Sequence, residues 1–117
     1  MPADADIALI ERLAKLETAG LSDVLDEMGY SNQVLASSLR PLDNERRLAG
    51  IAFCVRGENR VVTQSQTAQQ PPFSPYEIER AMQPGLVAVI DAGAQNAGAM
   101  IGGFVATSLK SKGCQGL

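Results

Sequence analysis

A single aspartate followed by clustered glycines is the feature of this sequence best suited to chemistry. Asp91 ends a short apolar run, and Gly93, Gly98, Gly102 and Gly103 come after it. Glycine inside a helix costs about 1 kcal/mol relative to alanine. We therefore expect the last two of these glycines to lie at or before the start of a helix.

A helix that starts there would expose backbone donors. The N–H groups of Gly103, Phe104 and Val105 would point at one spot, because the first turn of a helix has no internal acceptors for them. The helix dipole adds positive potential at the same place, so an anion such as a carboxylate is favoured. The alternative is that Gly102 and Gly103 only permit close packing of the helix on a sheet.

Two polar residues at predicted strand ends extend this candidate site. Ligands of α/β proteins bind beyond the carboxyl ends of the strands, where Asp91 would lie. Its carboxylate is either a metal or water ligand or a cap for the following loop. Asn59 leaves another apolar segment together with Glu58 and could face the same cleft.

The composition excludes several kinds of chemistry. The chain has no histidine, which removes Ser-His-Asp and Cys-His nucleophiles and histidine-bound zinc. A metal would need oxygen ligands, which favours magnesium, manganese or calcium. Neither G-x-G-x-x-G nor G-K-[ST] is present. Cys54 and Cys114 are expected to be two buried thiols in a reducing compartment.

Length and charge describe a single small domain. The chain has 117 residues, of which 45% are hydrophobic and 20% charged, so residues 1–117 are expected to form one globular domain. The net charge of −3 argues against nucleic acid and anionic membranes as partners. No apolar run approaches the roughly 20 residues of a membrane helix, and no signal peptide is apparent. A cytoplasmic protein is expected.

Hydrophobic spacing and capping residues predict two helices near the N-terminus. Apolar residues recur at helical spacing over residues 7–16, and Gly20 is expected to end that helix. A second short helix is expected to start at Ser22 as N-cap and to end at Gly29.

The remainder alternates between strands and helices. Residues 48–55 are expected to form a buried strand, and residues 64–72 a loop or a disordered segment. Ser74 and Pro75 mark a helix start, residues 86–90 a second strand, and Gly113 the end of the last helix. Residues 115–117 resemble the approach to a further strand. This alternation predicts an α/β fold with a parallel or mixed sheet.

The succession of segments resembles the RraA-like family, which includes the regulator of ribonuclease E activity and the 4-hydroxy-4-methyl-2-oxoglutarate aldolases, once mislabelled dimethylmenaquinone methyltransferases. The resemblance covers nearly the whole chain, in the family's order, and corresponds to the N-terminal portion of the family's domain. It rests on residues 21–29, 39–42, 47–53, 75–85, 87–91, 102–106 and 112–117.

The resemblance implies a swivelling β/β/α-type sandwich that assembles as homo-trimers or hexamers with sites between subunits. Enzymes of the family are class II lyases that cleave 2-oxo acids, release pyruvate and decarboxylate oxaloacetate with a divalent cation such as Mg²⁺ or Mn²⁺. The substrate carboxylate would be held at the glycine-loop helix, here Gly102, Gly103, Phe104 and Val105.

One departure from the family's pattern affects the expected activity. The family's glycine is followed further along the chain by Arg-Asp, which orients substrate and anchors the metal. Gly103 fits the glycine, but the Arg-Asp would fall beyond Leu117, and no Arg-Asp occurs in the sequence. We therefore expect a truncated, incomplete domain with no metal bound and no activity, from a parent that is an aldolase. The alternative is a non-catalytic regulator that binds a ribonuclease.

Overall fold

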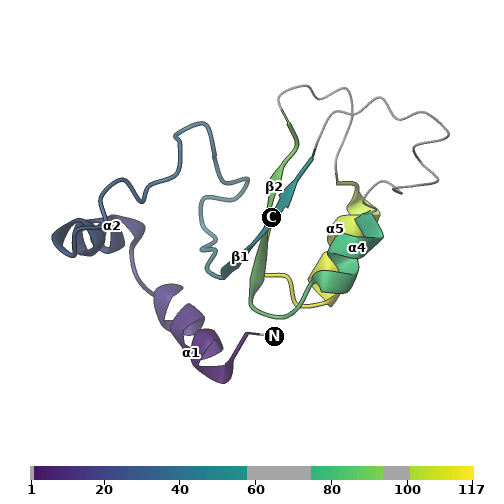
Figure 1. The fold of residues 1–117 in the computed structure, drawn as a ribbon, viewed down its shortest axis with the longest axis horizontal. Helices are drawn as coiled ribbons and strands as arrows, with labels where there is room; N and C mark the ends of the chain where they lie inside the picture. Colours follow the sequence, from purple (N-terminus) through teal and green to yellow (C-terminus); the bar gives the residue numbers. More distant parts are fainter. Residues whose placement is uncertain (1, 58–74, 94–100) are drawn as a thin grey trace. The chain divides into compact units, whose positions relative to one another are not determined.

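The computed structural model describes residues 2–57, 75–93 and 101–117 of the chain. Its contacts divide into two compact units, Ala3–Ala49 and Gly50–Leu117. The first contains two helices, and the described part of the second contains a small sheet with two further helices (Figure 1). Within the described residues no helix is long and apolar enough to cross a membrane.

Helix α1 (Asp4–Leu13) confirms the first predicted helix, although it starts earlier and ends before the predicted Gly20. Two acidic residues, Asp4 and Asp6, lie in its first turn, where the helix dipole favours negative charge. The carboxylate of Asp6 also accepts the N–H of Ala3 at 2.8 Å, so the start of the helix is stabilised by a local hydrogen bond.

Helix α2 (Thr18–Glu27) corrects the predicted boundary between the first two helices. Gly20 and Ser22 both lie inside this helix, so the prediction of a glycine stop and a serine N-cap was wrong; the N-cap is Glu17. A single glycine costs a helix only about 1 kcal/mol. The helix forms despite that cost, because Leu21 and Leu25 keep the helical spacing of apolar residues.

The end of α2 is as predicted. Gly29 has φ +86°, a conformation that glycine adopts without the penalty of a Cβ. Its N–H donates to the carbonyl of Asp26 at 3.0 Å, and the N–H of Tyr30 donates to the carbonyl of Leu25 at 2.8 Å. This pair of bonds is the Schellman arrangement that closes a helix.

The second unit is built on parallel strands, which confirms the α/β prediction. Strand β1 (Ile51–Arg56) pairs with β2 (Leu86–Asp91), with Ile51 opposite Leu86 and Arg56 opposite Asp91. The other edge of β2 accepts the end of the chain, since Val87 forms a parallel bridge with Gly116. The predicted approach of residues 115–117 to a further strand is therefore confirmed.

Helices α4 (Pro75–Ala81) and α5 (Gly103–Ser111) contact each other and lie on one face of this sheet (Figure 1). The core lies between helices and sheet, where Ile78, Met82, Ala88 and Leu109 are buried. Pro75 is the first helical residue of α4, as predicted, because its fixed φ suits that position. Ser74 and the predicted loop at residues 64–72 lie outside the described residues.

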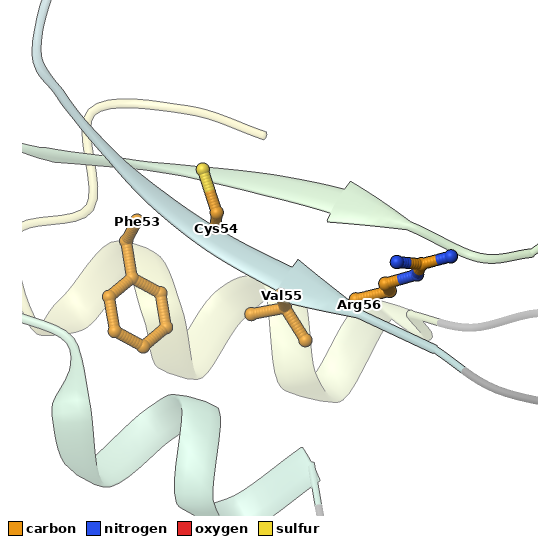
Figure 2. Close-up of a pocket in the computed structure, with 4 residues that line it drawn as sticks. All are labelled: Phe53, Cys54, Val55 and Arg56. Atoms are coloured by element: carbon orange, nitrogen blue, oxygen red, sulfur yellow. The ribbon is translucent and has the colours of Figure 1, made fainter.

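The prediction that β1 is a buried strand was wrong, because its side chains alternate between two environments. Phe53 and Val55 point toward the helices, whereas Cys54 points away from them (Figure 2). Cys54 is exposed and Cys114 is half-buried, so two buried thiols were also predicted incorrectly. The physical reason is that α4 and α5, the helices described in the Gly50–Leu117 unit, both lie on the same face of the sheet.

Candidate functional site

The candidate site lies at the carboxyl ends of β1 and β2. Each helix that connects parallel strands runs back along the sheet, so the N-terminus of α5 lies at this end. The site therefore combines two strand ends with the first turn of a helix. This is the end of the sheet at which α/β proteins bind ligands.

Within the described part of the chain, the first turn of α5 presents backbone donors that have no recorded acceptor. Gly102 is the N-cap, with φ −95° and ψ 169° and without a side-chain cap. Its carbonyl accepts the N–H of Ala106 at 3.0 Å, which is the first bond of the helix. The N–H groups of Gly103, Phe104 and Val105 precede that bond and have no carbonyl acceptor within the helix. The predicted helix start is confirmed; binding at these groups stays a prediction.

Close packing does not explain the two glycines. Among the described residues, no heavy atom lies within 4 Å of the Cβ that Gly102 or Gly103 would carry. Neither glycine has a positive φ, so the backbone does not demand glycine either. Both glycines are exposed residues. Phe104 is 76% exposed beside them, whereas Val105 packs against the core and holds the helix on the sheet.

Asp91 caps the loop that leaves β2. Its Oδ1 accepts the N–H of Gly93 at 3.0 Å, and its carbonyl accepts the N–H of Gly57 at 2.7 Å. Gly93 has φ +71°, which the turn requires and which glycine supplies. Asp91 thus connects the segments that leave β1 and β2. Of the two roles predicted for its carboxylate, a metal or water ligand and a loop cap, the hydrogen bond to Gly93 is that of the cap.

Arg56 is a site residue that the sequence reasoning missed. Its Nε lies 4.0 Å from Oδ2 of Asp91, and the two side chains are 82% and 67% exposed. Arg56 also lines a shallow depression along β1 together with Phe53, Cys54 and Val55 (Figure 2). The sequence feature that could have indicated Arg56 is its position as the residue that ends an apolar run, directly before Gly57.

The described part of the chain contains no group of side chains that could coordinate a divalent cation. No group of three His, Cys, Asp or Glu side chains there comes close enough to hold a metal ion. Asp91 is a single carboxylate, and it is already bonded to Gly93 and adjacent to Arg56. Asn59, the other predicted cleft residue, lies outside the described residues.

Comparison with known protein families decides the affiliation of the chain. The sequence model of the RraA-like family, described as Aldolase/RraA, matches residues 18–117. The chain belongs to the RraA-like family. The match begins at the first residue of α2 and includes every site residue discussed above. Searches among curated proteins and among solved structures gave no match. The resemblance inferred from the sequence is thus confirmed at the level of the family.

Proposed function

We propose that this RraA-like chain binds the carboxylate of a small 2-oxo acid at the N-terminus of α5. The reaction class is carbon–carbon bond cleavage by an aldolase or oxaloacetate decarboxylase that releases pyruvate. The family match supports the reaction class. The observation that carries the proposal is the exposed first turn of α5, with Gly102 as an N-cap that contributes no side chain.

The chemistry of this turn suits a carboxylate. The N-terminus of a helix carries roughly half a positive elementary charge, and N–H bonds to a charged acceptor contribute about 1.5–3 kcal/mol each. The amides of Gly103, Phe104 and Val105 bind and orient the acid. The bound carboxylate fixes the direction in which the 2-oxo group and the scissile bond extend.

Divalent metal chemistry, usual for enzymes of this type, is not assigned to these residues. A metal ion stabilises an enolate as a Lewis acid and needs fixed oxygen or nitrogen ligands. The carboxylate of Asp91 serves Gly93 instead, and the described residues offer no ligand group. The chain's own contribution to the proposed reaction is therefore binding and orientation.

A proline substitution tests the proposed carboxylate site directly. Gly103→Pro removes one donor while proline fits the first helical position, and Gly102 already has the extended backbone that precedes proline. Gly103→Ala retains the N–H and is the matched control. With 2-oxopentanoate titrated against the ¹⁵N-labelled chain, we expect about tenfold weaker binding for the proline variant and unchanged binding for the alanine variant.

Two results would count against the proposal. Equal affinity of the two variants would show that the amide of Gly103 is not a donor to the acid. Absence of pyruvate release from oxaloacetate with added Mg²⁺, measured on a chain that also carries the family's Arg-Asp, would remove the assigned reaction class, whatever the outcome for binding.

A second candidate function, binding to a protein partner, is favoured by a different observation. No residue between positions 2 and 49 is buried, although this unit contains two amphipathic helices. Large exposed apolar side chains there include Leu9, Leu16, Val24, Met28, Tyr30, Val34, Leu35, Leu39, Leu42 and Leu48. Such surfaces favour docking, either in a homo-trimer or hexamer or on a ribonuclease. Sedimentation of the chain alone and with a ribonuclease distinguishes these partners.

A further inference from the structure

Strand β1 uses only one of its two edges within the described residues. Its odd-numbered residues bond to β2; the N–H of Ile51, for example, donates to the carbonyl of Gly85 at 2.9 Å. Successive residues of a strand direct their N–H and C=O groups to opposite edges. The other edge therefore carries the backbone groups of three residues, and no described segment pairs with it. These open-edge residues are Ala52, Cys54 and Arg56.

The depression along β1 lies at this open edge. The described residues that line it are four consecutive residues of the strand, Phe53, Cys54, Val55 and Arg56 (Figure 2). Consecutive side chains point to opposite faces of a strand, so a depression that all four share runs along the edge and not over one face. By contrast, β2 is paired on both edges, with β1 and at Gly116. A free strand edge is a template for a further strand.

We propose that the open edge of β1 pairs antiparallel with the same edge of a second copy, about a two-fold axis at Cys54. Opposed residues of an antiparallel pair must both direct their backbone groups to the shared edge. With Cys54 opposite the partner's Cys54, Ala52 faces the partner's Arg56. In this register every open-edge residue of one copy faces an open-edge residue of the other. The contact is isologous and closes with two copies.

The side chains of β1 suit this register. Phe53 faces the partner's Val55, and aromatic residues opposite β-branched ones stabilise a strand pair. Arg56 is the one charged residue of the strand, and it faces alanine, so no like charges oppose each other. The Cys54 side chain points away from α4 and α5, so both thiols stay on the face of the sheet that these helices do not cover (Figure 2).

Charge exchange at the axis tests the proposal. Cys54→Lys alone, or Cys54→Glu alone, places two like charges directly opposite each other and is expected to weaken the pairing of copies about fivefold. An equal mixture of the two variants is expected to associate at least as tightly as the wild-type chain, because a lysine then faces a glutamate. Analytical ultracentrifugation measures the dissociation constants, and native mass spectrometry identifies the mixed pair.

Val89→Lys is the matched control. Val89 is the neighbour of Cys54 in the parallel register and is 49% exposed, so this variant adds the same charge to the same face of the sheet. It lies one strand further from the axis, which is roughly 5 Å more on each copy. Its association is expected to equal that of the wild-type chain. Both positions are exposed, and circular dichroism should show an unchanged fold in all variants.

Four results would overturn the proposal. The first is a wild-type chain that stays monomeric, and the second is association of Cys54→Lys as tight as that of the wild-type chain. The third is a mixture of the lysine and glutamate variants that associates no better than either alone. The fourth is equal weakening by Cys54→Lys and Val89→Lys, which would indicate general charge repulsion. These substitutions leave the first turn of α5 unchanged, so the proposed carboxylate binding is tested separately.

Discussion

Replacing Gly113 by alanine is expected to destabilise the sheet unit by about 2–5 kcal/mol. Gly113 follows α5 with φ +85°, and its N–H donates to the carbonyl of Lys110 at 3.0 Å. A side chain in this left-handed conformation costs about 1–2 kcal/mol. A Cβ there would also lie 2.9 Å from both Cα and Cγ of Pro84. Because the proline ring is stiff, relieving that overlap costs about 1–3 kcal/mol more.

Urea unfolding followed by circular dichroism measures this loss of stability. The control is Gly103→Ala, which places a methyl group where no described heavy atom lies within 4 Å. Alanine favours a helix over glycine by up to about 1 kcal/mol, so the control is expected to be neutral or slightly stabilising. Equal destabilisation by the two substitutions, or no loss of stability in Gly113→Ala, would refute the account of how α5 is joined to the segment that bridges β2 at Gly116.

Three further outcomes follow from the same packing. Leu109→Ala should lower the free energy of unfolding by about 2–5 kcal/mol in the same urea assay, because Leu109 is 1% exposed in the core. Gly50→Ala should cost about 1–3 kcal/mol, since its Cβ would lie 2.7 Å from Cγ2 of Val87; an unchanged midpoint would contradict that contact. Iodoacetamide should alkylate Cys54 several-fold faster than Cys114, whose thiol donates to a backbone carbonyl at 3.1 Å; mass spectrometry resolves the two, and equal rates would contradict their exposures.

The helix ends were largely predictable from glycine chemistry, because a left-handed residue or an accessible first turn leaves a strong local signal. Gly29 and Gly113 both adopt positive φ after a helix, and Gly102 precedes one, as the sequence predicted. The boundary predicted at Gly20 and Ser22 was wrong, because a local signal at these two residues was outweighed by the pattern around them. Both residue types are common at helix boundaries, but here the apolar spacing on either side continues one helix through them.

Tertiary arrangement was harder to predict than local structure. The apolar run of β1 fits a strand covered on both faces or on one, and only the position of the helices decides between them. That ambiguity produced the wrong environment for Cys54. Arg56 was missed because its pairing with Asp91 depends on strand register, which no local pattern in the sequence encodes.

The amide resonances of the α5 first turn give the most direct test of the central claim. In ¹⁵N–¹H spectra of the chain titrated with 2-oxopentanoate, Gly103, Phe104 and Val105 are predicted to shift together and to saturate with one dissociation constant. These amides lack acceptors within the helix, and Gly103 and Phe104 are exposed residues. Resonances that stay in place at saturating acid, or that move only with ionic strength, would contradict a carboxylate site at this helix.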